Sequence, residues 1–180
     1  LQGFGKSVGI AATGEGRLYY SLVTEGIRTD GAVTVEDRNL RVRRELLDRS
    51  GNAVNPLAIR QNDLLVVRIT LTAGVDRLGN IAITDLLPAA FEIENPRLTE
   101  TTQYGFIRNP SVPEYLDVRD DRMNIYTGFT PGDGGAKTFF YMVRAVTQGR
   151  FRHPPVVAEA MYAAGQYYSA SGGGRVTVAR

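Results

Sequence analysis

The stretch DLLVVRITLT, Asp63–Thr72, limits the possible folds of this chain more than any other part of it. Successive side chains of a strand point to opposite faces, and every second residue from Leu65 to Leu71 is a large aliphatic one. The alternate face is mixed, because it includes Arg68 and Thr70. This pattern predicts a strand with one face in a core and the other half buried.

Other segments repeat the strand signal. Lys137–Val146, KTFFYMVRAV, is aromatic and β-branched on both faces, as expected for a central strand covered on both sides. Weaker signals lie at Arg17–Thr24, Leu40–Leu46, Asn80–Asp85 and Arg175–Ala179, bounded by turn sequences such as ATGEG, DRSGN and SGGG. Short strands without a long helical pattern predict an all-β fold, an antiparallel β-sandwich with at most one short helix.

The segment PPVVAEAMYAAG, Pro154–Gly165, is ambiguous when taken alone. Alanine, glutamate and methionine favour a helix, and a proline pair often precedes one. Alternation of small and larger residues favours a strand over Val156–Tyr162. In an all-β setting the strand is the simpler interpretation, and it leaves Met161 and Tyr162 at an exposed strand end.

Composition excludes several classes of protein. The 180 residues include no cysteine, so disulfides, thiolate metal sites and an in-chain thioester are impossible. The formal charge of +2 argues against a nucleic-acid or anionic-membrane partner. The chain begins at Leu1 without a signal peptide and shows no apolar run long enough to span a bilayer, and we interpret Leu1 as a cut point within a longer protein.

Motifs that resemble ligand sites have simpler explanations. Thr130–Thr138, TPGDGGAKT, lacks the glycine before lysine and the following helix of a phosphate loop, so it is typical of a hairpin turn. Asp117, Asp120 and Asp121 are close together but lack the glycine and glutamate of a calcium loop. We expect a structural turn in which Asp120 or Asp121 caps backbone amides and pairs with an arginine such as Arg122.

No catalytic constellation is apparent either. His153 is the only histidine, and nothing near it resembles a nucleophile, so we expect a solvent-facing loop residue. Glu92 and Glu94 are spaced to share a strand face, and the simplest interpretation is a solvated face. The sequence predicts no catalytic residue, no metal site, no cofactor and no small-molecule substrate.

Two arginine-containing segments suggest structural roles. Arg41 and Arg43, in RVRRE, share a strand face without neighbouring aromatics, which is typical of a charged edge strand. Arg144 lies among apolar residues of FFYMVRAV, and the pattern predicts that it is buried. A buried guanidinium needs a carboxylate, for which Asp85, Asp120 and Asp121 are the candidates.

Four ordered blocks carry a family resemblance over most of residues 37–180: TDLLPAAFEIENPRL, DVRDDRMNIY, FFYMVRAVTQGRFRHPPVVAEAMY and the terminal GRVTV. Together they resemble the carboxy-terminal, macroglobulin-type domain of bacterial alpha-2-macroglobulins. The preceding ATGEGRLYYSLVTEGI resembles the last strand of a CUB-like module. This likeness implies residues 1–36 as the end of that module and residues 37–180 as the macroglobulin-type sandwich.

The resemblance implies a non-catalytic part of a protease-trapping inhibitor. In such proteins a protease cleaves a bait segment, and a Cys-x-Glu-Gln thioester in another domain can acylate the attacker. By resemblance, Met161 and Tyr162 cover that thioester, although Ala163 and Ala164 follow them where relatives often have Asp-Pro. The expected partners are the thioester and CUB-like domains of the parent chain and the trapped proteases.

Two further expectations concern context. The resemblance implies a periplasmic parent, with a lipid anchor in the inner membrane as one form it could take. Two alternatives stay open: Met161 and Tyr162 would pack an interdomain interface in a parent without a thioester, or the chain would be an immunoglobulin-like adhesion or assembly module.

Overall fold

The strand pattern is realised as a sandwich. The computed structural model describes residues 11, 13–21, 35–94, 104–163 and 165–180, which divide into two units, 1–31 and 32–180. The described residues form thirteen strands and no helix: β1 (Glu36–Arg38), β2 (Leu40–Leu47), β3 (Ile59–Arg60), β4 (Leu64–Ala73), β5 (Leu78–Leu86), β6 (Phe91–Ile93), β7 (Tyr115–Arg119), β8 (Arg122–Phe129), β9 (Ala136–Ala145), β10 (Gly149–His153), β11 (Val156–Ala160), β12 (Tyr168–Ser171) and β13 (Gly174–Ala179).

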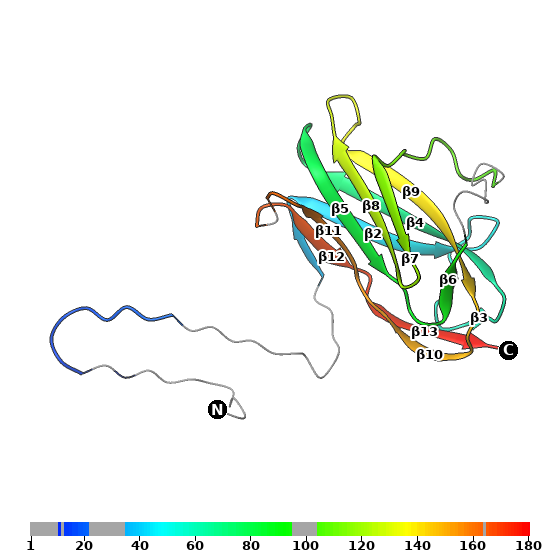
Figure 1. Ribbon diagram of the computed structural model, residues 1–180, viewed down its shortest axis with the longest axis horizontal. Coiled ribbons are helices and arrows are strands. Elements are labelled where there is room, and N and C mark those ends of the chain that lie inside the picture. Colours follow the sequence, from blue (N-terminus) through cyan, green and yellow to red (C-terminus); the bar gives the residue numbers. More distant parts are fainter. Residues whose placement is uncertain (1–10, 12, 22–34, 95–103, 164) are drawn as a thin grey trace. The chain divides into compact units, whose positions relative to one another are not determined.

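The strands form three sheets (Figure 1). A six-stranded sheet has the order β1-β12-β11-β5-β8-β7, and a four-stranded sheet has the order β2-β4-β9-β6. A small third sheet, β10-β13-β3, contains the parallel pair β13–β3, whereas the pairs within the other two sheets are antiparallel. The antiparallel sandwich predicted from the sequence is therefore confirmed.

The main core lies between the facing sides of the two larger sheets. Alternate residues from Leu65 to Leu71 on β4 are at most 2% exposed, and they meet Ile81 and Ile83 from β5 in the same buried cluster. Burying such side chains contributes about 1.5–3 kcal/mol each relative to leaving them in water. The predicted core face of Asp63–Thr72 is correct.

The four-stranded sheet is also covered on its outer face. Met142 of β9, Val66 of β4 and Leu47 of β2 are buried there beneath Tyr104 and Ile107. Strand β9 lies between β4 and β6 and is therefore central and covered on both sides, as its sequence predicts.

Two serines of β12, in the six-stranded sheet, join it to β2, an edge strand of the four-stranded sheet. The backbone N–H of Val42 on β2 donates to Ser169 Oγ at 2.9 Å, and Ser171 Oγ donates to the Val42 carbonyl at 2.5 Å. Both serines lie on β12 and are at most 2% exposed. These side chains satisfy backbone groups of an edge strand that would otherwise be buried without partners.

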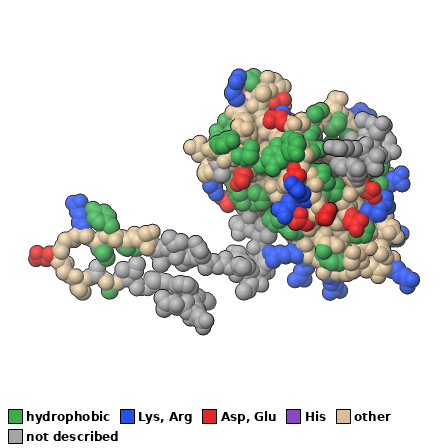
Figure 2. Space-filling view, in the orientation of Figure 1, with side chains coloured by type: hydrophobic (Ala, Val, Ile, Leu, Met, Phe, Trp, Pro, Cys, Tyr) green, Lys and Arg blue, Asp and Glu red, His purple; other side chains and the backbone are tan. Residues whose placement is uncertain are grey.

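Strand β7 forms the other edge of the six-stranded sheet. Among the described residues it pairs only with β8, and it exposes Tyr115, Leu116 and Val118. Figure 2 shows hydrophobic side chains beside acidic and basic ones on this view of the molecule. Ion pairs such as Asp117–Arg119 lie on this edge and protect it from pairing with other chains.

Comparison of predicted and observed strands gives two corrections. Val156–Tyr162 is a strand only to Ala160, since Met161 and Tyr162 form a turn. Arg17–Thr24 shows no strand over its described part, 17–21, and residues 22–24 lie outside the described residues. Residues 17–21 pair with no strand among the described residues. The assignment of this segment to a CUB-like module stays a prediction.

Candidate functional site

The turn after β11 carries the residues that the sequence singles out. Strand β11 lies between β12 and β5, and its residues Val156, Ala158 and Ala160 are buried because they face the core. After Ala160 the chain leaves the sheet, and Met161 and Tyr162 turn into solvent with 44% and 86% of their surfaces exposed. The predicted exposure of a Met-Tyr pair at the end of a buried strand is confirmed.

The turn is closed by local backbone hydrogen bonds. The N–H of Ala163 donates to the Ala160 carbonyl at 2.9 Å, and the N–H groups of Gln166 and Tyr167 donate to the Ala163 carbonyl at 2.9 and 3.0 Å. The N–H of Ala160 donates in turn to the Tyr167 carbonyl. We call residues 161–163 and 165–167 the lid turn. Its geometry presents an apolar aromatic ring and a thioether without making them part of the core.

A buried polar cluster lies between the two larger sheets, and it is not the one predicted. Arg44 of β2 forms an ion pair with Asp85 of β5, and their side chains are only 3% and 0% exposed. Tyr141 of β9 donates its hydroxyl to Asp85 Oδ2 at 2.7 Å. Arg44 also donates to the carbonyls of Pro154 at 2.8 Å and Gly172 at 2.6 Å.

The electrostatics of the cluster follow from burial. Desolvation raises the pKa of Asp85 above its usual value, although Arg44 and the Tyr141 hydroxyl oppose this effect. Burial and the neighbouring carboxylate raise the pKa of Tyr141. Because both carboxylate oxygens and the guanidinium have partners, the cluster is a structural crosslink between sheets.

Arg144 differs from its prediction. It is 41% exposed and pairs with Glu94 at 2.6 Å, and it also donates to the Asn62 carbonyl at 3.2 Å. Arg144 shares the outer face of β9 with Met142, whereas Asp85 faces the inner core. The four-stranded sheet therefore lies between Arg144 and Asp85, so the assignment of Asp85 to Arg144 is wrong.

The aspartate-rich segment forms the hairpin turn between β7 and β8. Asp120 and Asp121 occupy the two turn positions. Asp121 accepts two hydrogen bonds from Arg122, at 2.9 and 2.7 Å, and these bonds lower the pKa of Asp121. Its backbone carbonyl accepts from the N–H of Leu87 at 2.9 Å. Arg144 is not a partner of Asp121, whose arginine partner is Arg122.

His153 is buried, contrary to the expectation of a solvent-facing loop residue. It ends β10, is 5% exposed, and its ring meets Phe91 edge-on with a centroid distance of 5.9 Å. Burial, together with the positive charge of Arg44, lowers the pKa of His153 to about 3, so the imidazole is neutral near pH 7. Its Nε2 atom has no hydrogen-bond partner within the described part of the chain. Alternation from Phe151 did not reveal this, because β10 was not recognised as a strand.

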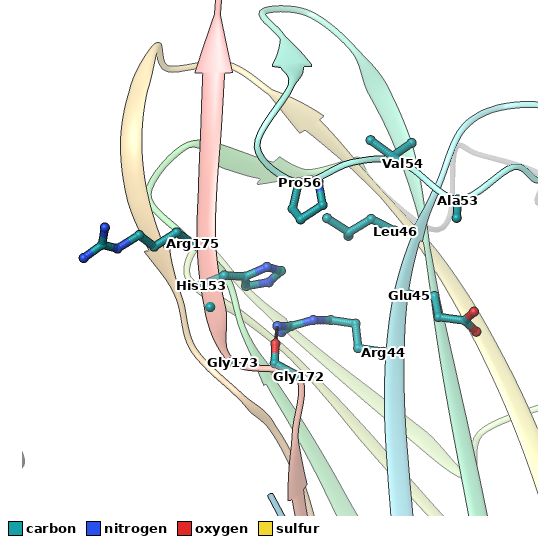
Figure 3. A pocket seen from close by; sticks show the side chains of 11 residues that line it. Arg44, Glu45, Leu46, Ala53, Val54, Pro56, His153, Gly172, Gly173 and Arg175 are labelled. Carbon is teal, nitrogen blue, oxygen red and sulfur yellow. Dashed lines mark hydrogen bonds between the residues drawn. The ribbon is translucent and has the colours of Figure 1, made fainter. Parts of the chain in front are cut away.

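A cavity of about 300 Å³ lies between His153 and Arg44 (Figure 3). Both side chains reach into it from opposite sides, while Glu45 and Arg175 point away. The described residues contain no group of three or more acidic, histidine or cysteine side chains placed to hold a metal. In the same part of the chain there is no helix long and apolar enough to cross a membrane.

Comparison with known families identifies this sandwich. Residues 40–164, from β2 through Ala164, match the model described as the bacterial alpha-2-macroglobulin MG10 domain. The chain belongs to the bacterial alpha-2-macroglobulin family. Alpha-2-macroglobulin of Xylella fastidiosa strain 9a5c is 31% identical over 168 residues, which cover 87% of the chain and 10% of that relative. The chain therefore spans about a tenth of the relative's length.

Solved structures agree with the macroglobulin assignment. Salmonella alpha-2-macroglobulin reacted with methylamine has 25% identity and a TM-score of 0.74, over 84% of this chain and 10% of that one. Trypsin-activated alpha-2-macroglobulin from Escherichia coli matches with a TM-score of 0.73 and 24% identity, over 84% of this chain and 11% of that one. The latter likeness concerns the fold of this macroglobulin domain.

Proposed function

We propose that this macroglobulin domain is the non-catalytic carboxy-terminal part of a protease-trapping inhibitor, and that Met161 and Tyr162 shield a thioester on another domain of the parent chain. The observation that carries the proposal is the lid turn. It displays an apolar pair outside the domain's own core, at the end of a strand held on both sides. A pair in this position is available to cover a group on a neighbouring domain.

The chemistry of a thioester requires such a cover. An activated acyl group reacts with water and amines, so it lasts only where both are excluded. A tyrosine ring supplies a large rigid apolar surface, and a methionine side chain adapts to the remaining gaps. Burial of the Tyr162 ring would remove roughly 150–250 Å² from water, worth about 4–6 kcal/mol before ordering costs.

The relatives support a reactive acyl group in the parent. One similar structure is of a Salmonella alpha-2-macroglobulin reacted with methylamine, and another is of a trypsin-activated protein from E. coli. We extend both properties, reaction with amines and response to proteases, to the parent of this chain. Because the chain contains no cysteine, the thioester would lie in a different domain.

The context of the domain is part of the proposal. We infer that residues 1–36 end a CUB-like module and that the lid turn faces the thioester domain of the same chain. The parent would act in the periplasm, where it meets incoming proteases. Its action would consist of trapping, without turnover by this domain.

The test is performed on the uncleaved parent protein. Methylamine is added, and free thiol is counted over time in the wild type and in a Met161→Ala/Tyr162→Ala variant. The lid residues are not core residues, so the variant should fold normally and release thiol faster. A matched control is Tyr115→Ala/Val118→Ala, which removes an exposed pair from β7 and should leave the rate unchanged.

Two outcomes would count against the proposal. Equal rates in the wild type and the lid variant, with the thioester present in both, would show that Met161 and Tyr162 pack an interface without shielding. A parent gene without a Cys-x-Glu-Gln motif would favour the adhesion or assembly module instead.

A further inference from the structure

We propose that Arg38, Asn39 and Asn80, which lies in a bulge of β5, are positioning residues that clamp the lid turn from its two sides. The inference rests on the proposed function, because it explains how Met161 and Tyr162 are held toward a partner domain. It concerns contacts that neither the family likeness nor the sequence pattern indicates. All three residues lie outside β11 and its turn.

The first side of the clamp is the end of β1 together with Asn39, the residue between β1 and β2. Arg38 Nη1 donates to the carbonyl of Gly165 at 3.0 Å, and Asn39 Nδ2 donates to the carbonyl of Gln166 at 3.1 Å. The Arg38 guanidinium also lies over the Tyr168 ring, 5.5 Å from its centroid. Two adjacent residues, Arg38 and Asn39, therefore hold two consecutive carbonyls of the lid turn.

The second side of the clamp is a bulge in β5. The register between β5 and β8 shifts between Leu78 and Ile81, and Asn80 lies within the shift at a φ of 55°. Its carbonyl accepts the N–H of Met161 at 2.9 Å. Because Ala160 lies opposite Ile81 in the β11–β5 ladder, this bond continues that ladder by one step and ties the first residue of the turn to the bulged end of β5.

The clamp contacts differ from those that close the turn. Backbone hydrogen bonds join Ala160, Ala163, Gln166 and Tyr167 and fix the shape of the turn, but the orientation of the turn depends on its attachments. Hydrogen bonds from Asn80 at one end of the turn, and from Arg38 and Asn39 at the other, restrict its movement relative to the sheet. A pre-ordered lid loses less conformational entropy when a partner covers it, and therefore shields more effectively.

Asn39 permits a clean test, because its φ of 50° lies in the left-handed region that glycine adopts without strain. Asn39→Gly keeps the backbone conformation and removes the donor to Gln166. The matched control is Asn62→Gly, at another asparagine of positive φ, 71°, in the turn before β4. Both changes carry a similar cost in the unfolded state, so differences between them report the clamp.

The first measurement is amide hydrogen exchange in the 180-residue chain. Asn39→Gly and Arg38→Met should each speed exchange at residues 161–167 by roughly three- to tenfold, the effect of losing one hydrogen bond. Exchange in β4 and β9 should stay unchanged, Asn62→Gly should leave the turn unchanged, and Arg38→Lys should restore part of the protection. Unchanged exchange at 161–167 in both clamp variants would overturn the inference.

The second measurement uses the parent and methylamine. Asn39→Gly and Arg38→Met should release thiol faster than the wild type and Asn62→Gly. If only the Met161→Ala/Tyr162→Ala variant reacts faster, the proposed role of the clamp in shielding is refuted and shielding itself stands. If that double variant also matches the wild type, the proposed function fails, and hydrogen exchange still decides whether the clamp exists.

Discussion

At the scale of single residues, Arg44 and Arg144 each pair with a carboxylate but differ in their exposure to water. The side chains of Arg44 and Asp85 are 3% and 0% exposed, whereas those of Arg144 and Glu94 are 41% and 32% exposed. Water screens the Arg144–Glu94 pair but has little access to the Arg44–Asp85 pair. Removal of one partner therefore leaves a buried unpaired charge only in the inner cluster.

Arg44→Ala should lower the free energy of unfolding by about 3–5 kcal/mol, because it strands the Asp85 carboxylate in the core. Arg144→Ala should cost no more than about 1 kcal/mol. Urea denaturation of both variants measures the difference. A triple variant, Arg44→Met with Asp85→Leu and Tyr141→Phe, should recover much of the loss because no polar group remains unpaired. Equal losses for the two alanine variants would contradict this account.

His153 should make stability depend on pH. Its pKa is 6.5 when unfolded and about 3 when folded. Between these pH values the unfolded state binds more protons than the folded state. The contribution of His153 to the free energy of unfolding is therefore complete above pH 6.5, and it falls on acidification by at most about 1.4 kcal/mol per pH unit. Denaturation at pH 7.0 and 5.0 measures the slope. His153→Leu should flatten it, and an unchanged slope would show that other groups cause it.

At the scale of elements, β12 closes the sandwich through its side chains. Ser169→Ala removes the acceptor of the buried Val42 N–H and should cost about 1–3 kcal/mol. Ser171→Ala removes the donor to the Val42 carbonyl. A buried carbonyl tolerates the loss of a partner better than a buried N–H does, so this variant should lose less stability than Ser169→Ala. The exposed Ser50→Ala is the control and should stay within about 0.5 kcal/mol of the wild type. Thermal unfolding followed by circular dichroism checks the order of the three.

The elements show which sequence signals were sufficient. Strongly alternating or doubly apolar segments, such as the one that forms β4, were predicted with nearly correct bounds. Strand β12, YSAS, was missed because its buried residues are two serines and an alanine, which carry no hydrophobic periodicity. The sequence does not predict strand β8, because the aspartates that precede it favour a turn.

The candidate site was only partly accessible to the same reasoning. Alternation indicates a strand with Met161 and Tyr162 at its exposed end, and both side chains are exposed, but it does not predict that the strand stops at Ala160. The burial of Arg44 could have been predicted, since it continues the inward alternation of Leu40 and Val42 on β2. Its pairing with Asp85 could not, because it depends on how two sheets face each other, which no local pattern contains.

At the scale of the whole molecule, we expect the 180-residue chain to fold alone and to be inert. Its strands share a continuous core within unit 32–180, and the described residues offer no metal cluster. Circular dichroism should show a β-rich spectrum and a cooperative transition that a chelator does not shift. Peptide and ester substrates should remain intact. Hydrolysis that is lost on substitution of His153, or a midpoint lowered by the chelator, would contradict the expectation.

The lid turn also has a place in the order of synthesis. Arg38 and Asn39 each contact a carbonyl 127 positions later in the chain, and β2 meets the serines of β12 across similar separations. Contacts so distant in sequence form slowly and require both partners to have left the ribosome. The N-terminal strands therefore wait for almost the entire domain to be translated. The surface that would face a reactive partner is among the last parts of this domain to be completed.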